Sequence, residues 1–171
     1  MTRPTPTDYA PPHASYVDLV DEDDILSAMQ EQSSVTQKLL AQLDETRASY
    51  RYETGKWSVK ELIGHVVDAE RIIGYRALCV ARGDTQPLPG FDESSYVANA
   101  SFDSWKLGDL AEHYALVRRS NLVFFQNLQD EAWDRRGTAN QYPVSVRGLA
   151  YVIVGHERHH LKVLREKYNI T

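Results

Sequence analysis

The sequence has little of several features that mark particular classes of protein. It contains one cysteine, Cys79, so no disulfide can form within the chain, and a lone thiol is typical of a reducing compartment. The longest strongly apolar run, GLAYVIVG, is far shorter than the about 20 residues that cross a bilayer. The N-terminal MTRPTPTDYAPPHASY lacks the apolar stretch of a signal peptide. These absences predict a soluble, cytoplasmic protein without a membrane partner.

Positive charge is also scarce. The chain has 19 lysines and arginines against 24 acidic residues, which gives a formal net charge of −5. Nucleic-acid binding depends on clustered positive charge that faces phosphates, so this balance predicts no nucleic-acid partner. Arg135, Arg136 and Arg147 are the exception, and we expect this small basic group to bind an anionic substrate group or to pair with nearby acids.

The length predicts one domain, or one domain with a tail. A globular chain of 171 residues buries roughly 70% of its unfolded surface and needs no disulfide or metal merely to fold. Four of the seven prolines lie in the first twelve residues. We therefore divide the chain into an extended, Pro-rich arm at 1–18, mobile unless it packs on the rest, and a domain at 19–171.

After the arm come four long stretches with helical periodicity, and none shows sustained strand alternation. The first spans about 21–43 and the second begins with a capping box, SVKE at 58–61, and stops before Gly83. The third starts near Asp103 or Ser104 and the fourth runs from about Ser145 to Tyr168. The prediction is an all-α four-helix bundle.

Two connections, 84–102 and 131–144, are longer than a bundle requires. Long loops in a small domain are often functional, and these two could cover one end of the bundle. The alternative is that a loop simply crosses the bundle to reach a distant helix start.

Histidines are concentrated near the C-terminus, where His156, His159 and His160 fall within five residues. At about 100° per residue, His156 and His160 lie near the middle of the apolar face of the last helix, and His159 lies about 80° off its centre. On the second helix, His65 falls inside the apolar arc. His13 belongs to the arm, and His113 lies at the edge of the third helix's stripe.

Buried neutral imidazoles cost free energy unless their nitrogens find partners. One interpretation is a pair of core histidines that form hydrogen bonds with tyrosines or carboxylates. The other is a metal ion, for which an i, i+4 pair is a good chelating arrangement. Three inward histidines on two helices favour the metal, with one or two coordination positions left open.

The last helix also matches H-E-x-x-H, the zinc-protease signature in which the glutamate is a general base. Only eleven residues follow His160, and the extended signature would need glycine and histidine where this chain has Val163 and Glu166. No strand-rich half is present in the sequence pattern to bind a peptide. We interpret the match as coincidence and expect Glu157 on the flank of the helix face.

These motifs resemble the DinB-like (damage-inducible protein) family of metal-binding four-helix bundles. The resemblance rests on KWSVKELIGHVVDAERIIGYRALCVARGD at 56–84, PLPGFDE at 87–93 and VSVRGLAYVIVGHERHHLKVLREKY at 144–168. The specific element is W-S-x-x-E-x-x-x-H combined with a late H-x-x-H-H. The family is distinct from the DNA polymerase of the same name.

The resemblance implies a metal site on His65, His156 and His160 that holds a divalent ion, zinc or nickel. It also implies up-down-down-up helix order, with a long connection between the second and third helices, and a homodimer. Some relatives are transferases that use low-molecular-weight thiols such as bacillithiol or mycothiol. The implied partner is therefore a small molecule, with such a thiol as a candidate.

The functional prediction is a metal-dependent thiol S-transferase or hydrolase that acts on a small molecule through the three histidines. The alternative is a non-catalytic metal-binding or stress-response protein in which the metal is structural. No catalytic residue can be named from the sequence. Asp68, Glu70 and His159 are candidates to support the site, although a buried ion pair with Arg76 or Arg118 is the better interpretation of Glu70.

Overall fold

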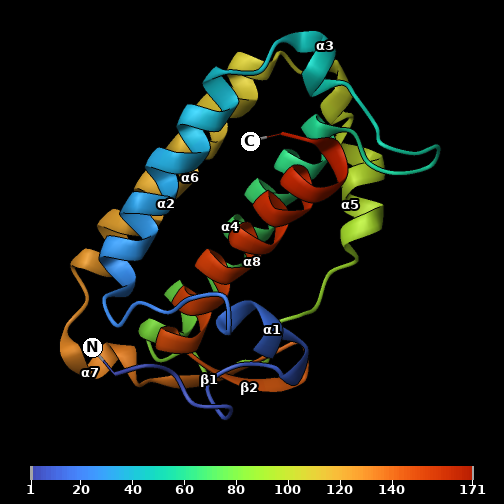
Figure 1. The fold of residues 1–171 in the computed structure, drawn as a ribbon. Coiled ribbons are helices and arrows are strands. Elements are labelled where there is room, and N and C mark those ends of the chain that lie inside the picture. Colours follow the sequence, from blue (N-terminus) through green and yellow to red (C-terminus); the bar gives the residue numbers. More distant parts are fainter. Residues whose placement is uncertain (1, 171) are drawn as a thin grey trace.

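The computed structural model describes residues 2–170, which form a helical bundle closed at one end by a two-stranded hairpin (Figure 1). In chain order the elements are η1 (Pro11–His13), α1 (Ala14–Val17), α2 (Ile25–Ala41), α3 (Glu45–Ala48), α4 (Val59–Ala81), α5 (Glu93–Ala100), η2 (Phe102–Ser104), α6 (Leu107–Gln126), α7 (Asp130–Trp133), β1 (Arg136–Ala139), β2 (Tyr142–Ser145) and α8 (Val146–Tyr168). None of the helices in residues 2–170 is long and apolar enough to cross a membrane.

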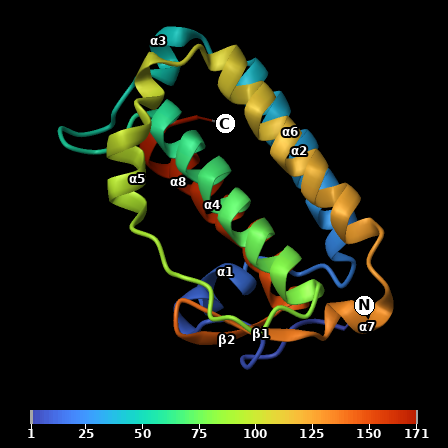
Figure 2. The same cartoon turned by 180° about the vertical axis from the view of Figure 1, so that it is seen from behind.

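The four long helices α2, α4, α6 and α8 confirm the predicted bundle. Helix α2 runs from the hairpin end to the α3 end, α4 and α6 both run back, and α8 returns, which is up-down-down-up order (Figures 1 and 2). Helix α4 packs against α8 and α6, and α2 packs against α6. Because α4 and α6 are parallel, the connection between them must travel the length of the bundle, and α5 lies on this path.

Side-chain caps fix where three of the four long helices begin, namely α2, α4 and α8. The Ser58 hydroxyl accepts a hydrogen bond from the Glu61 N–H, and the Glu61 carboxylate accepts one from the Ser58 N–H, so the predicted capping box is confirmed. Ser145 caps α8 through the Gly148 N–H. Asp24 caps α2, so the first long helix begins at Ile25 and the earlier acidic residues precede it.

The predicted start of the third helix is wrong by about one turn. Asp103 and Ser104 belong to η2, Trp105 is extended, and α6 begins at Leu107. The Asp103 carboxylate accepts a hydrogen bond from the Ser58 hydroxyl at 2.6 Å, and so it caps nothing on α6. Asp103 therefore makes a tertiary contact with Ser58, although aspartate is a residue type that often begins a helix.

The hairpin was not predicted. Strands β1 and β2 pair antiparallel and, apart from Ser145 at the end of β2, lie in the segment 131–144 that the sequence pattern assigns to a loop. Asn140 and Gln141 form the two-residue turn with φ of 48° and 69°. Two consecutive positive φ values are typical of a type I′ turn, which usually contains glycine. Strands of four residues without that signal leave little pattern to detect.

The N-terminal segment packs on α8. Its short helices η1 and α1 lie across the hairpin end of the bundle, and Tyr9 and Val17 are buried. Two glycines of α8, two turns apart, allow this close approach. A Cβ on Gly148 would lie 1.9 Å from the Asp8 carbonyl oxygen, and one on Gly155 would lie 2.0 Å from that of Tyr16. The domain division at residue 18 stays a prediction.

Gly155→Ala should therefore destabilise the protein by about 1–3 kcal/mol, because the new methyl group would force the α1 backbone away from α8. Chemical denaturation measures this change. Gly108→Ala is the matched control, because a Cβ added to Gly108 of α6 would have no neighbour within 4 Å, and this variant should gain about 0.5–1 kcal/mol. Stabilisation by both substitutions would contradict the close packing of α1 on α8.

Two apolar clusters fill the bundle, one toward the hairpin and one toward α3. A network of buried polar groups also crosses the bundle, centred on Arg118 of α6. Its guanidinium donates two hydrogen bonds of 2.8 Å to Glu70 of α4 and one of 2.6 Å to Glu157 of α8. Thr36 of α2 and Tyr114 also donate to Glu157, at 2.5 and 2.6 Å. All four long helices are thus joined through one charged cluster.

The prediction that Glu157 lies on the flank of its helix is wrong, because its side chain is 1% exposed and binds Arg118. Glu70 forms the ion pair that the sequence favours. Two of the three arginines in the small basic group are paired with acids as well: Arg136 contacts Asp8 and Arg147 contacts Asp134, at 2.7 and 2.5 Å. Arg135 donates to the Ala81 carbonyl oxygen.

Candidate metal site

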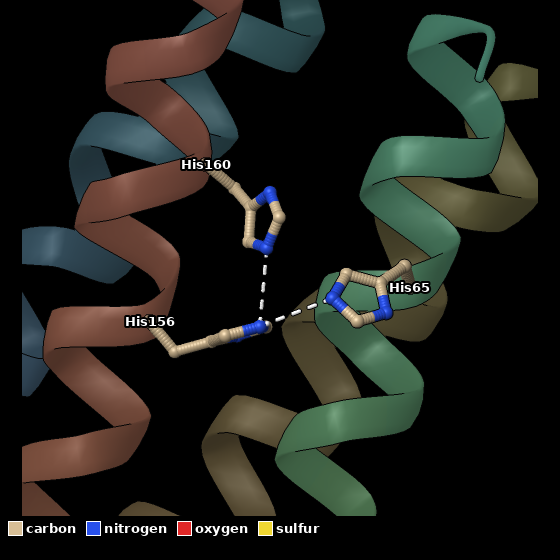
Figure 3. A group of neighbouring side chains, drawn as sticks. All are labelled: His65, His156 and His160. Carbon is tan, nitrogen blue, oxygen red and sulfur yellow. Dashed lines mark hydrogen bonds between the residues drawn. The ribbon is translucent and has the colours of Figure 1, made fainter. Parts of the chain in front are cut away.

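His65, His156 and His160 converge between α4 and α8 (Figure 3). Nε2 of His156 lies 3.1 Å from Nε2 of His65 and 3.1 Å from Nε2 of His160. The ligand atoms of the three residues all lie within 4.8 Å of one another. The structure brings together the same three side chains that the sequence nominates.

The local structure explains this convergence. The Ser58 cap sets the start of α4 and with it the direction in which His65 points. His65 lies on the side of α4 that packs along α8. His156 and His160 are one turn apart on α8 and project from the same face. All three residues lie inside helices and not in loops, so regular helical backbone holds all three imidazoles.

Burial keeps the three imidazoles neutral. It lowers the pKa of His65 to about 4, and burial together with His65 and His159 lowers the pKa of His160 to about 3. For His156, burial is again the largest cause and holds the pKa well below its usual range, with the neighbouring histidines adding to the effect. Neutral imidazoles have the free lone pair that a metal requires.

Hydrogen bonding alone accounts poorly for this arrangement. A neutral imidazole has one donor nitrogen and one acceptor nitrogen, so the single Nε2 of His156 cannot accept two well-directed bonds in its ring plane. Nδ1 of His160 is buried and has no hydrogen-bond partner among the described residues. Nitrogens that bind one tetrahedral zinc ion at about 2.0–2.1 Å lie about 3.3 Å apart, close to the two spacings of 3.1 Å from His156. The donor set fits a divalent metal.

Pockets reach the three histidines from two sides. The first, called the arm pocket because residues of the N-terminal arm line it, has a volume of about 180 Å³. It is lined by His65 and His156 together with residues of η1, α1 and α5. A second pocket of about 190 Å³, lined by Trp57 and Tyr168 among others, reaches His160. The Trp57 ring lies 4.9 Å from that of His65, and the Tyr16 ring meets His156 edge-on at 5.3 Å. Aromatic walls therefore border a site that small molecules can approach.

The glutamate of the H-E-x-x-H match, Glu157, does not face the histidines. Glu157 follows His156 directly, and about 100° of helix rotation points its carboxylate into the Arg118 network and away from the imidazoles. In a zinc protease this glutamate would have to face the metal. The structure therefore supports the interpretation of the match as coincidence.

The candidate supporting residues lie outside the group of three. Asp68 is half-buried; burial raises its pKa, while the nearby His113 and Arg71 oppose this rise. No hydrogen bond joins Asp68 to His65 among the described residues. The His159 ring packs 5.3 Å from Tyr16 and 5.1 Å from His160. Both roles remain predictions.

Sequence reasoning missed Glu93 as a site residue. Its carboxylate oxygen lies 3.9 Å from Nε2 of His65, and 61% of its side chain is exposed. Asp92 caps α5 through the Ser95 N–H, which turns the next residue toward the arm pocket. Both alternatives for 84–102 therefore hold in part, since this segment crosses the bundle to reach α6 and its residues Phe91 and Glu93 line the arm pocket.

A known protein family accounts for most of the chain. The family model described as DinB superfamily matches residues 28–164. The chain belongs to the DinB superfamily. A search of curated proteins finds no match.

Solved structures share the fold. YfiT from Bacillus subtilis, described as a probable metal-dependent hydrolase with an unusual four-helix bundle topology, aligns with a TM-score of 0.73 and 13% identity over 96% of this chain and 95% of its own. A mycothiol-dependent maleylpyruvate isomerase aligns with a TM-score of 0.68 and 14% identity. The alignment covers 85% of this chain, and this chain spans only 61% of the isomerase chain. At these identities the likeness shows the DinB-like fold alone.

Proposed function

We propose that this chain is a divalent-metal-dependent enzyme that acts on a small molecule, either transferring a low-molecular-weight thiol to an electrophile or hydrolysing its substrate. The observation that carries the proposal is the convergence of three neutral Nε2 atoms beside a pocket. The group of potential ligands among residues 2–170 contains these three residues and no fourth. A structural zinc site usually has four protein ligands, whereas a catalytic site keeps a position open.

His65, His156 and His160 would hold the ion through Nε2. Imidazole ligands suit zinc and nickel, which are the proposed metals, although affinity order rather than ligand type separates such ions. The ion would supply Lewis acidity, which lowers the pKa of a bound nucleophile and polarises an electrophile. Relatives of similar fold are described as a probable metal-dependent hydrolase and as a mycothiol-dependent isomerase, which supports both reaction classes.

The remaining steps belong to side chains of the pocket. The carboxylate of Glu93, 3.9 Å from Nε2 of His65, is placed to accept the proton that a thiol or water loses. Its exposure allows it to pass that proton on to solvent. Trp57 and Tyr16 restrict the space around the histidines and would orient the substrate.

The first test is elemental analysis of the untagged protein beside His160→Ala. We expect about one equivalent of transition metal in the wild type and much less in the variant. The loaded protein is then assayed for consumption of glutathione, bacillithiol and mycothiol with model electrophiles, and for hydrolysis of model esters and amides. Glu93→Gln should lower turnover while metal content stays the same.

Two results would overturn this proposal at different points. Metal binding without turnover of any of these compounds would favour the alternative of a structural metal in a binding or stress-response protein. Absence of metal from a folded wild type, even after incubation with zinc and nickel, would remove the metal function altogether. The homodimer and the cytoplasmic location stay predictions, which size-exclusion chromatography and cell fractionation test.

A further inference from the structure

Arg76 of α4 is a buried cation without a carboxylate partner in the described chain. Its side chain lies in the same helix as His65, three turns further on, and the residue is 6% exposed. One hydrogen bond is formed, from Nη2 to the Pro89 carbonyl oxygen at 2.7 Å. The Phe91 ring lies 5.9 Å from the guanidinium carbon. A guanidinium has five N–H donors, so most of its capacity is free.

The other buried arginines are neutralised. Arg118 contacts Glu70 and Glu157, and Arg147 contacts Asp134 at 2.5 Å. Burial of an unpaired charge costs several kcal/mol in effect, so such charges are normally paired. Burial also lowers the pKa of Arg76, and no acidic group counters this. The unpaired guanidinium is therefore the feature that requires an explanation.

Arg76 faces the pockets beside the three histidines. It lines the arm pocket together with His65 and His156, and it also lines an adjoining pocket of about 190 Å³ that extends to Asn140 of the hairpin. The two pockets share four lining residues, Arg76, His13, Phe91 and Glu93. A ligand in this space would have the histidines at one end and the guanidinium at the other.

His13 provides a second polar group in the same place. Its Nδ1 is buried and has no hydrogen-bond partner among residues 2–170. Burial and the Arg76 charge both lower the pKa of His13, which reflects how near the two side chains are. The packing of the N-terminal segment on α8 thus brings an unused imidazole nitrogen up to an unpaired guanidinium.

We propose that Arg76 and His13 form a carboxylate-binding subsite, and that the substrate of the metal site is a small carboxylic acid whose reactive group lies at the histidines. The placement of the reactive group at the histidines rests on the proposed function, whereas the binding of a carboxylate by Arg76 and His13 does not. The planar fork of arginine matches a carboxylate in a bidentate arrangement. The apolar side chains of Ile73, Val152 and Phe91 also line the arm pocket and suit a short carbon skeleton.

A carboxylate fits the charges better than a phosphate does. The pockets provide one guanidinium and one neutral imidazole, and Glu93 contributes a negative charge to the same lining. A phosphate monoester carries about two negative charges at neutral pH and needs more donors than these. A monoanion with two oxygens is matched by the groups available.

The test is an NMR titration of the full chain with benzoate, alongside benzamide as a neutral analogue of the same shape and phenyl phosphate as the dianion. It is run on zinc-loaded protein and on protein stripped by a chelator, since a carboxylate could also bind zinc itself. We expect benzoate to bind both forms more tightly than either analogue. Shifts should appear at Tyr16, Phe91 and the α4 amides around Arg76.

Substitutions assign the binding to Arg76. Arg76→Gln should weaken benzoate binding to the metal-free protein by about tenfold or more, as expected for loss of a charged hydrogen-bond pair. Arg76→Lys should retain part of the affinity, because it keeps the charge but loses the fork. His13→Ala should weaken binding less than Arg76→Gln. Arg71→Gln is the control, because Arg71 is exposed on the same helix outside both pockets.

Each outcome separates the two proposals. Benzoate binding that depends on Arg76 in the metal-free protein supports the subsite even where no metal binds. Equal binding of benzoate and benzamide, tighter binding of phenyl phosphate, or unchanged affinity in a folded Arg76→Gln protein would overturn it. If Arg76→Gln fails to fold, His13→Ala and Arg76→Lys decide, and unchanged affinity in both would overturn the proposal.

Discussion

Arg118→Met should lower the free energy of unfolding by about 3–5 kcal/mol, because it leaves Glu70 and Glu157 buried without a counter-charge. Arg118 is fully buried, and both glutamates are at most 3% exposed. Burial acts to lower the pKa of Arg118, but Glu157 and Glu70 outweigh it and raise that pKa well above its usual range. For a chain of this size the loss corresponds to a fall of roughly 6–20 °C in the melting temperature.

The control is Arg119→Met, the same substitution at the next residue, which is exposed. Away from buried features such a change usually stays within about 0.5 kcal/mol. Adding Glu70→Gln and Glu157→Gln to Arg118→Met should recover part of the loss, since neutral amides remove the repulsion. An Arg118→Met protein as stable as the wild type would show that the network contributes no net stability.

This network also bears on the site, because Glu157 and His156 are consecutive residues. The ion pair to Arg118 and the bonds from Thr36 and Tyr114 fix the rotation of α8 about its axis. The same rotation directs His156 toward His65. The charged cluster therefore orients the histidine pair from an adjacent side of the helix, in the way that outer groups orient metal ligands.

The sequence predicts the histidine cluster because regular helix geometry governs it. His65 lies two turns after a capping box, and His156 and His160 lie one turn apart, so phase along two helices is enough to direct all three inward. That α4 lies beside α8 could not be derived from periodicity and came from the family resemblance. Helical periodicity shows which face of a helix is buried, but not which partner buries it.

Glu157 shows where helical-wheel reasoning fails. A flank exists only on a helix with one side in solvent, and residues 145–157 of this chain are all buried. Arg76, Glu93 and His13 were missed for a different reason. Their surroundings depend on where segments 2–18 and 84–92 lie. Contacts between residues distant in sequence fix these positions, such as the bridge between Leu88 and Ala139.

Zinc should raise the melting temperature of the wild-type protein, and His156→Ala should abolish that rise. A ligand that binds only the folded state stabilises it by about 2.7 kcal/mol at 100 times its dissociation constant, which is roughly 5–11 °C here. His156 is central to the prediction because its Nε2 is the one within 3.1 Å of both other Nε2 atoms. Differential scanning calorimetry with and without zinc, after treatment with a chelator, measures the shift.

His159→Ala is the matched control, because His159 is adjacent to the site on the same helix but does not belong to the group of three. It should keep the zinc-dependent rise of the wild type, whatever its own melting temperature. This comparison separates metal ligation from core packing, since both alanine variants lose an imidazole but only one loses a ligand. Equal stabilisation of all three proteins would place zinc on surface groups, and the buried imidazoles would then be core residues joined by hydrogen bonds.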